Sequence, residues 1–300
     1  MKSIYAFICA ESAAGHHRVT ILCRTLKVSR ASYYRWKDHE PTAREVERAD
    51  LKKRIIRIFH EEGEGTYGAI RVHRKLKEEL DCLEDERICS VKRVQKIMRE
   101  LGLVSCHRKK WKPTPSQNRV EERPNLLAQD FTTTNLNQKW VTDITYIETK
   151  KDGWCYLSTI LDLHSRKIIG YSFGKNMDTE LIIDTLKDAV LNRKFTPGEL
   201  ILHSDLGSQY TSKRYEAALE SLEINHSFSK KGCPYDNAGI ESFHATIKKE
   251  RIYQRSTYRS FEEAQRDVFD YIHRFYNRKR IHSSIFYLTP VQMEERTLAS

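Results

Sequence analysis

Apolar residues in the front third of the chain recur at helical spacing. Residues 18 to 37 predict two short helices that break at Lys27 and Val28, with Ser29 placed to cap the second helix. This pattern is typical of a helix-turn-helix, although many plain helical hairpins share it. Three longer helices are predicted near residues 43 to 60, 66 to 80 and 90 to 101. The front of the chain is therefore predicted to be all-α.

The helix near residues 90 to 101 has the clearest ends. Ser90 can cap its start, and Gly102 stands where the chain must leave the helix. Its apolar residues form one stripe and are expected in a core: Val91, Val94, Ile97, Met98 and Leu101. The exposed faces of these helices carry basic residues, among them Arg71 and Arg74, which either contact phosphates or merely solvate the surface.

After Lys139 the pattern changes to the short β-branched and aromatic runs of strands. Strands are predicted at Lys139 to Thr149, Trp154 to Leu163, Lys167 to Phe173, Leu200 to His203 and Ile224 to Phe228. Helices are predicted at Thr179 to Asn192, Ser208 to Leu222, Asn237 to Arg251 and Phe261 to Tyr276. This order predicts an α/β fold, a mixed five-stranded sheet flanked by helices, preceded by all-α helix-turn-helix modules.

Five segments follow from these elements. They are a helix-turn-helix segment (1-40), a second helical module (41-104), a basic linker (105-134), an α/β core (135-253) and a C-terminal helical tail (254-300). The linker contains three prolines between residues 105 and 125 and a basic cluster at Arg108, Lys109 and Lys110. A connector of this composition either tracks nucleic acid or serves as a simple spacer.

The charge is unevenly distributed. The net charge is +11, and residues 1 to 124 hold 28 Lys and Arg against 18 Asp and Glu, whereas residues 125 to 300 hold 24 against 23. A basic front and a nearly neutral back suggest a polyanion-binding module joined to a part that needs its own carboxylates. A solvated charged surface would give the same counts.

Other function classes lose support from the composition. No apolar run approaches the roughly 18 to 20 residues that a membrane helix needs. The seven cysteines are scattered and form no C-x-x-C pair, which argues against a disulfide framework and against a zinc knuckle. A reducing cytoplasm fits this cysteine usage.

Three acidic residues of the back half lie at a strand middle, a strand end and a helix start, from which their side chains can converge. Asp143 is in the middle of the first predicted strand, Asp205 follows the end of the fourth, and Glu241 is near the start of a helix. They converge if the first and fourth strands are neighbours. Three carboxylates brought together repel one another, and a bound cation is the ordinary remedy. Taken singly, each has a plainer role as a core aspartate, a turn former or a surface charge.

Carboxylate oxygens with room left for water and phosphate select Mg²⁺ or Mn²⁺. Two such ions about 4 Å apart activate an attacking oxygen and stabilise the leaving one during in-line displacement at phosphorus.

Other polar residues near the expected centre have less specific patterns. Asp162 and Asp236 are spare ligands or strand-end and turn residues, and His203 and His244 either position water or pack.

The spacing of the three acids is specific. Sixty-one residues separate Asp143 from Asp205 and thirty-five separate Asp205 from Glu241. Here the chain resembles the retroviral-integrase-like DDE superfamily, whose core is ribonuclease-H-like. The motifs WVTDITYI, HSDLGSQY, DNAGIESFHATIKKE and YNRKRIHSSIFYLTP, with TYGAIRVHRKL and VQKIMRELGL in front, are similar to bacterial insertion-sequence transposases encoded by a second reading frame. The resemblance covers residues 18 to 292.

The resemblance implies a catalytic and metal-binding triad of Asp143, Asp205 and Glu241 with two Mg²⁺ or Mn²⁺ ions. It implies hydrolysis of one DNA strand to free a 3′-OH, which then attacks another phosphodiester and first joins one end to the other in a circular intermediate. Double-stranded DNA, as terminal inverted repeats and as target, is the implied partner. A homo-oligomer on paired ends and a frameshift fusion with the upstream product are also implied. The same resemblance implies that residues 41-104 are a DNA-binding module, that residues 135-253 are a ribonuclease-H-like integrase catalytic core, and that the protein is bacterial and nucleoid-associated in the cytoplasm.

The resemblance further implies DNA contacts. Lys248, seven residues after Glu241 and on the same helix face, matches a basic residue that contacts the DNA end in integrase-like enzymes. Position 245, where related integrases can carry another basic residue, is alanine. The expected DNA-binding residues outside the triad are Lys248, Arg30, Arg35, Arg71, Arg74, Arg108, Lys109, Lys110, Arg278 and Arg280.

Two other functions remain open from the sequence. One is a DNA-binding regulator with an inactive core, and the other is a purely hydrolytic ribonuclease-H-like nuclease. The presence of all three acids at family spacing disfavours the regulator. The nuclease shares the metal chemistry, so only the products separate it from a transposase.

Overall fold

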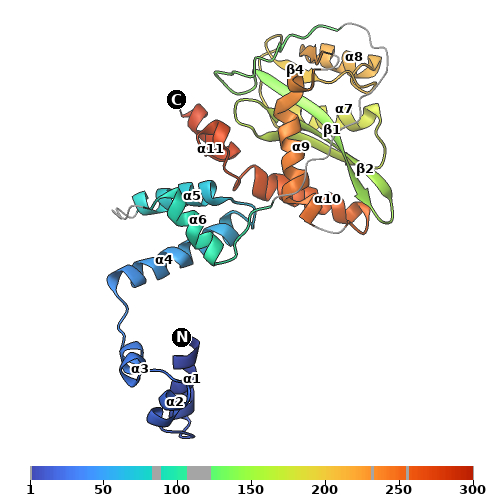
Figure 1. The fold of residues 1–300 in the computed structure, drawn as a ribbon. Helices are drawn as coiled ribbons and strands as arrows, with labels where there is room; N and C mark the ends of the chain where they lie inside the picture. Colours follow the sequence, from blue (N-terminus) through green and yellow to red (C-terminus); the bar gives the residue numbers. More distant parts are fainter. Residues whose placement is uncertain (1, 83–88, 107–122, 231–232, 255–256, 300) are drawn as a thin grey trace. The chain divides into compact units, whose positions relative to one another are not determined.

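The computed structural model describes residues 2–82, 89–106, 123–230, 233–254 and 257–299. Within it the chain divides into two compact units, Met1–Arg54 and Ile55–Ser300 (Figure 1). The division falls inside a helix, fourteen residues beyond the boundary predicted after residue 40. The catalytic core and most of the helical module that precedes it therefore belong to one unit.

The first unit contains α1 (Lys2–Ala13), α2 (Val19–Thr25) and α3 (Arg30–Lys37), followed by the larger part of α4 (Ala43–Arg57). The predicted break is confirmed: Lys27 has a positive φ of 53°, and the Ser29 side chain accepts a hydrogen bond from the Ser32 N–H at the start of α3. The sequence did not predict α1. The core of this first unit is built from Tyr5, Ile8, Leu22, Cys23 and Tyr33. Tyr5 and Ile8 of α1 thus complete a core that two helices alone could not enclose.

A helical module follows, with α4 (Ala43–Arg57) continuing into a π-helical turn (Ile58–Glu62), then α5 (Ala69–Cys82) and α6 (Val91–Glu100). The predicted ends of α6 are confirmed, because Ser90 accepts from the Arg93 N–H and Gly102 has a φ of 68°. The stripe predicted in α6 is buried at Val94, Ile97 and Met98. These apolar residues stabilise the module.

Five strands form one mixed sheet. They are β1 (Lys139–Thr149), β2 (Gly153–Asp162), β3 (Ile168–Gly174), β4 (Ile201–Ser204) and β5 (Asn225–Phe228). Their order is β3-β2-β1-β4-β5; β1, β2 and β3 are antiparallel, and β4 lies parallel to both β1 and β5. The predicted sheet is confirmed, and so is the adjacency of the first and fourth strands.

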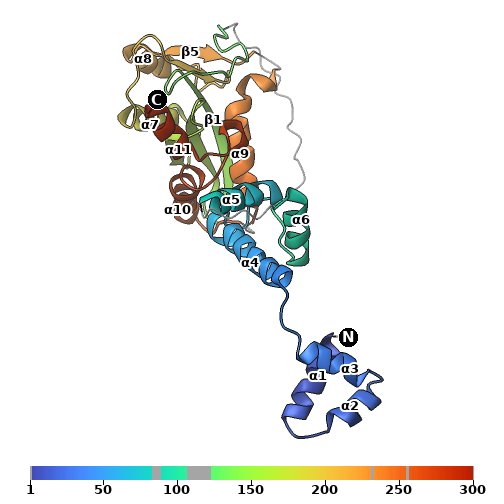
Figure 2. The ribbon, with the colours of Figure 1, turned by 90° about the vertical axis from the view of Figure 1, so that its left-hand side faces the viewer.

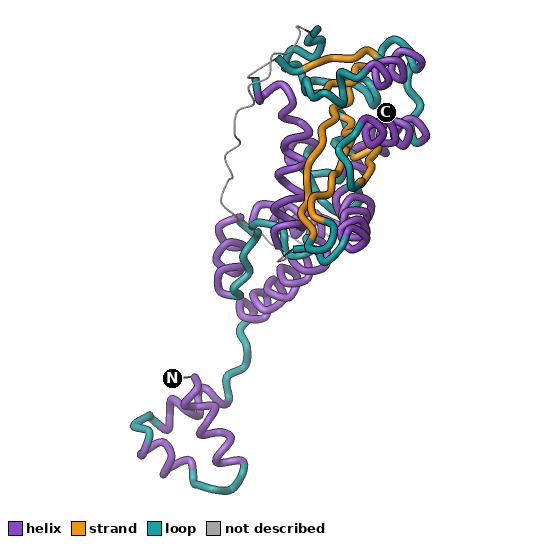
Figure 3. The backbone as a smooth tube through the Cα atoms, turned by 90° about the vertical axis from the view of Figure 1, so that its right-hand side faces the viewer, coloured by secondary structure: helices purple, strands orange, loops and turns teal. Residues whose placement is uncertain are grey.

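Helices cover both faces of the sheet (Figures 2 and 3). One face carries α7 (Thr179–Leu191) and α8 (Lys213–Ser221), and the other carries α9 (Ala238–Glu250). The helix predicted from Ser208 begins only at Lys213, because residues 207 to 211 form a turn and Ser212 supplies the cap. A buried cluster fills the α7 and α8 side: Trp140, Ile160, Ile182, Leu186, Leu202, Tyr215 and Leu219 are among its members.

Gly170 lets β3 and α7 approach closely. A Cβ at this position would lie 2.6 Å from the Thr185 carbonyl oxygen and 2.7 Å from the Ala189 nitrogen, which are backbone atoms that cannot swing away. Gly170→Ala is therefore expected to lower the free energy of unfolding by about 2 kcal/mol. Chemical denaturation is the measurement, and Gly68→Ala, where the nearest contact would be Ser105 Oγ at 3.7 Å, is the control. Equal stability of the two variants would contradict this account of the packing.

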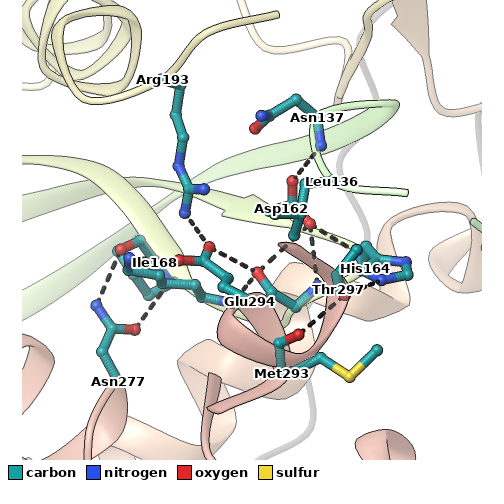
Figure 4. Close-up of polar contacts among 12 residues, drawn as sticks. Leu136, Asn137, Asp162, His164, Ile168, Arg193, Asn277, Met293, Glu294 and Thr297 are labelled. Atoms are coloured by element: carbon teal, nitrogen blue, oxygen red, sulfur yellow. Dashed lines mark hydrogen bonds and ion pairs between the residues drawn. The ribbon is translucent and has the colours of Figure 1, made fainter. Parts of the chain in front are cut away.

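The C-terminal tail packs against the same unit. It contains α10 (Phe261–Asp270), a π-helical turn (Tyr271–Tyr276) and α11 (Pro290–Leu298). Glu294 of α11 forms ion pairs with Arg193 and with Lys167, the latter at 2.6 Å (Figure 4). The Asn277 side chain pairs with both the N–H and the carbonyl of Ile168. These contacts fix the tail to β3 and to the end of α7.

Glu250, at the end of α9, is the centre of a buried ionic network. It accepts hydrogen bonds of 2.8 Å from Arg280 Nε, from Arg280 Nη2 and from the Tyr271 hydroxyl, and Arg71 Nη1 lies 3.6 Å away. Tyr67 of the helical module donates to the Lys279 carbonyl at 2.6 Å. Three segments far apart in the sequence therefore meet at one carboxylate: the helical module, α9 and the tail.

Candidate active site

The sheet positions Asp143 toward α9. Side chains alternate along β1, so Thr142 contacts Tyr210 on the α8 side, with 3.2 Å between the two hydroxyl oxygens, while Asp143 faces the opposite way. Its Oδ2 lies 3.2 Å from His244 Nδ1 on α9, and its side chain is 23% exposed. A carboxylate in the middle of this strand is thus open to solvent on one side.

Asp205 follows β4 directly. Because β4 pairs in parallel with β1, its C-terminal end brings Asp205 beside the middle of β1. The Gly207 N–H donates to Asp205 Oδ1 at 2.9 Å and holds the carboxylate in a turn. Partial removal of the carboxylate from water and the nearby charge of Asp143 raise the pKa of Asp205 to about 6.

Glu241 lies in the first turn of α9. Burial of its carboxylate and the charge of Asp143 raise its pKa, and His244 partly offsets the rise. All three acids line one pocket of about 260 Å³. Its wall consists of Asp143, Asp205, Ser229, Lys230, Cys233, Asn237 and Glu241. The predicted convergence of a strand middle, a strand end and a helix on one pocket is therefore found.

The three carboxylates line the same pocket but are too far apart to ligate one metal ion together in this structure. Among the described residues, no group of three or more His, Cys, Asp or Glu side chains is arranged closely enough to hold a metal ion. The charge of Asp143 nevertheless raises the pKa of both other acids, so it is close enough to repel each of them. Carboxylate oxygens are the donors that Mg²⁺ and Mn²⁺ prefer, so the chemistry of the three residues fits such an ion.

His244 has a more definite place than the sequence indicated. Its ring bridges two strands, with Nδ1 3.2 Å from Asp143 Oδ2 and Nε2 2.9 Å from the hydroxyl oxygen of Thr159 on β2. The side chain is buried. The signal that could have identified it is its position three residues after Glu241, on the same helix face.

Lys248 also projects from this face of α9. Its Nζ lies 4.5 Å from the centre of the Tyr146 ring on β1, a cation–π contact. Burial lowers the pKa of Lys248, and the charge of Asp143 opposes this shift. Lys230, which the sequence analysis did not select, is a second basic residue of the site because it lines the acidic pocket.

The remaining polar candidates have structural roles here. His203 is fully buried between the hydroxyls of Ser227 and Ser229, and burial lowers its pKa to about 4. Asp162 accepts from the N–H groups of residues 137, 164 and 165, as expected for a strand end (Figure 4). Asp236 accepts from the side chains of Asn125 and Gln129 and from the Lys230 N–H.

The expected DNA contacts outside the pocket differ in exposure. Arg30, Arg35, Arg74 and Arg278 are exposed. Arg71 is partly buried near Glu250, and Arg108, Lys109 and Lys110 lie outside the described residues. Arg280 is a correction: it is only 6% exposed, and its guanidinium is held by Glu250, so its burial indicates a structural role and not a phosphate contact.

Comparison with known families gives three matches. Residues 134–234 and 222–290 match integrase core domains, and residues 45–111 match an HTH-like domain. No helix in the described parts of the chain is long and apolar enough to cross a membrane.

Among solved structures, the chain is similar to a chain of a simian T-cell lymphotropic virus intasome in complex with PP2A regulatory subunit B56 gamma. The identity is 18% and the TM-score 0.44, and the match covers 69% of this chain and 67% of that one.

It is also similar to the HTLV-2 integrase catalytic core domain in complex with magnesium, at 19% identity and TM-score 0.40, covering 53% of this chain and 97% of that one. Much higher identity joins the chain to curated relatives. It is 39% identical over 256 residues to the transposase for insertion sequence element IS904 of Lactococcus lactis, which covers 85% of this chain and 97% of that protein.

It is also 35% identical over 298 residues to the transposase InsF for insertion sequence IS3A of Escherichia coli, covering 98% of this chain and 99% of that protein. Both relatives match over nearly their full length. The chain therefore belongs to the bacterial insertion-sequence transposases, in the family that includes the IS3 and IS904 proteins, and is a DNA-binding enzyme of the polynucleotidyl-transferase type.

Proposed function

We propose that Asp143, Asp205 and Glu241 are the catalytic triad of this transposase and together hold two divalent ions, Mg²⁺ or Mn²⁺. The observation that carries the proposal is that all three line a single pocket. The raised pKa values of Asp205 and Glu241 support it: burial is the larger cause, and the charge of Asp143 adds a repulsion between carboxylates that a bound cation relieves. When bound, the ions supply an activated attacking oxygen and charge stabilisation at phosphorus.

The side chains around the triad have distinct tasks in this proposal. His244 orients the Asp143 carboxylate through its hydrogen bond and is itself fixed by Thr159. Lys230 and Lys248 offer positive charge to the phosphates of a DNA end on either side of Glu241. No serine or tyrosine of the chain is required as a nucleophile, since the attacking groups are water in the first step and a DNA 3′-OH in the second.

The rest of the chain positions DNA. Arg30 and Arg35 on α3, with the exposed Arg74 and Arg278, contact the backbone of the terminal inverted repeats. The basic linker residues Arg108, Lys109 and Lys110 serve the same purpose. The protein acts as a homo-oligomer on paired ends, alone or fused to the product of the upstream reading frame, at the bacterial nucleoid.

A labelled DNA end tests this function. Purified protein is incubated with a cut, end-labelled duplex of the element's terminal repeat, with Mg²⁺, with Mn²⁺, or with EDTA. A strand-transfer product longer than the labelled strand is expected with either metal and is absent with EDTA. Shortened strands alone would show a hydrolytic nuclease, and binding without cleavage would show an inactive regulator; either result overturns the proposal.

Replacement of His244 tests its positioning role. His244→Ala is expected to lower cleavage by about 10- to 100-fold, the usual effect of losing a residue that orients a metal ligand. His244→Asn, which keeps one donor near Asp143, is expected to recover part of this loss. Cleavage rates at increasing Mn²⁺ are the measurement, because a purely structural role would not shift the metal concentration needed for half-maximal rate. An unchanged metal requirement in His244→Ala would exclude the role.

A further inference from the structure

A second pocket lies on another face of α9 and is lined by basic residues. Its volume is about 450 Å³. Gly239, Ser242 and Thr246 form its α9 wall, and this spacing of three and four residues places them on one face. Glu241, His244 and Lys248 project from a different face of the helix. The second pocket is therefore separate from the acidic pocket, with α9 between them.

Three guanidinium groups from separate segments line this pocket. Arg71 comes from α5, Arg166 from the turn after β2, and Arg280 from the tail. Burial and then the charges of all three arginines lower the pKa of His282 well below its usual value, so each guanidinium lies near this ring. His282 is therefore neutral and adds no charge, while the three arginines remain cationic.

The charges of these arginines are only partly compensated. Arg280 makes a two-point contact with Glu250, and Arg71 is 3.6 Å from the same carboxylate. Arg166 is different: no Asp or Glu in the described parts of the chain lies within ion-pair distance of it, and its Nε is buried without a hydrogen-bond partner. Asp162, the nearest acid in sequence, attracts Arg166 electrostatically, but its carboxylate is hydrogen-bonded to backbone N–H groups and forms no ion pair with Arg166.

A guanidinium that is only partly compensated in such a place is costly. A buried donor without a hydrogen-bond partner and a partly buried cation without an ion pair each destabilise a fold, and native proteins rarely keep them without a ligand. The backbone adds to this cost. Arg166 has a φ of 61°, in the left-handed region that residues other than glycine rarely adopt. The pocket also presents hydroxyls of Ser242, Thr246, Ser283 and Ser284, which make no hydrogen bond to any described residue.

We propose that this pocket, referred to below as the arginine pocket, binds a phosphate group, with Arg166 as its principal ligand. A guanidinium fork and free hydroxyls are the donors that phosphate oxygens accept, and Arg is the preferred residue for two-point recognition of phosphate. The phosphate comes either from a DNA backbone or from free inorganic phosphate, which share this chemistry. The site is independent of the acidic triad, because none of its lining residues belongs to that pocket.

The test uses full-length protein in EDTA, so that its failure is separate from a failure of the metal-dependent chemistry. Thermal unfolding is measured in sodium phosphate and in sodium chloride of equal ionic strength. Phosphate is expected to raise the Tm of the wild type and to have no such effect on Arg166→Gln. In chloride, Arg166→Gln is expected to be at least as stable as the wild type, because it removes an unpaired charge. Arg166→Lys keeps the charge without the fork and is expected to respond weakly.

Duplex DNA binding then identifies the source of the phosphate. If a backbone phosphate occupies the pocket, Arg166→Gln lowers affinity by roughly tenfold and the slope of log K against log salt by about one. The matched control is Arg214→Gln, which removes an exposed arginine paired with Glu180 on the other side of the sheet. A phosphate-specific rise in Tm with unchanged DNA affinity assigns the site to free phosphate. If neither the Tm nor the DNA affinity depends on Arg166, the proposal is overturned.

Discussion

Glu241→Gln is expected to lower metal-dependent strand cleavage by roughly 10³-fold, which corresponds to about 4 kcal/mol of transition-state stabilisation. The substitution keeps the size of the side chain but removes one of the three carboxylate charges in the pocket. DNA binding should change by less than about threefold, or rise slightly, because the change removes a negative charge that repels phosphate. Single-turnover cleavage of a labelled end and electrophoretic binding are the two measurements.

The matched control for this variant is Glu199→Gln. Glu199 is exposed and precedes β4, whereas Asp205 follows it, so the two residues lie at opposite ends of that strand. Cleavage by Glu199→Gln should equal that of the wild type. If Glu241→Gln cleaved at more than a tenth of the wild-type rate, Glu241 would not be a metal ligand, and the proposed triad would have to be abandoned.

Glu250→Gln is expected to lower the free energy of unfolding of the second unit by about 3 kcal/mol. Glu250 accepts three hydrogen bonds of 2.8 Å, and its partner Arg280 is only 6% exposed. The amide leaves the Arg280 cation in place without its counter-charge, which is the most costly way to disrupt a buried pair. Scanning calorimetry suits the measurement, because it can separate the transitions of the two units.

Two further variants make the result specific. Glu295→Gln, on the exposed side of α11, should change the stability by less than about 0.5 kcal/mol. The double variant Glu250→Leu with Arg280→Met removes both charges and should be more stable than Glu250→Gln alone. Full wild-type stability of Glu250→Gln would refute the network, and a stable Arg280→Met with a reduced salt slope of DNA binding would restore Arg280 as a phosphate contact.

The sheet and its helices could be predicted from the sequence because local signals agreed with the final packing. The β-branched and aromatic runs predicted as the first two strands pair as β1 and β2, and Ser29 and Ser90 cap their helices as predicted. The site followed from the same logic: once β1 and β4 are neighbours, Asp143 and Asp205 must be close. The helix α1 was missed because its apolar residues have no polar cap or clear stripe.

Long-range contacts explain what could not be predicted. Nothing local distinguishes Arg278, which is exposed, from Arg280, which is buried; the difference arises from Glu250, thirty residues earlier. The place of His244 three residues after Glu241 puts both on one helix face, but only the contacts of its ring with Thr159 and Asp143 show what it does. Arg166 resembled an ordinary turn residue. Its interest lies in a guanidinium Nε that is buried without a hydrogen-bond partner, which a sequence cannot reveal.

The packing of α9 predicts how an alanine scan along this one helix would look. Ile240, Phe243 and Ile247 are buried, so their truncation would unfold the protein more easily. Changes at Glu241 and Lys248 would spare stability and impair catalysis, while changes at Ser242 and Thr246 would register only when phosphate is present. Loss of stability, loss of catalysis and loss of phosphate binding would therefore alternate along the sequence with the 3.6-residue period of the helix. A single helix of thirteen residues would thus contribute to folding, chemistry and anion recognition from three different faces.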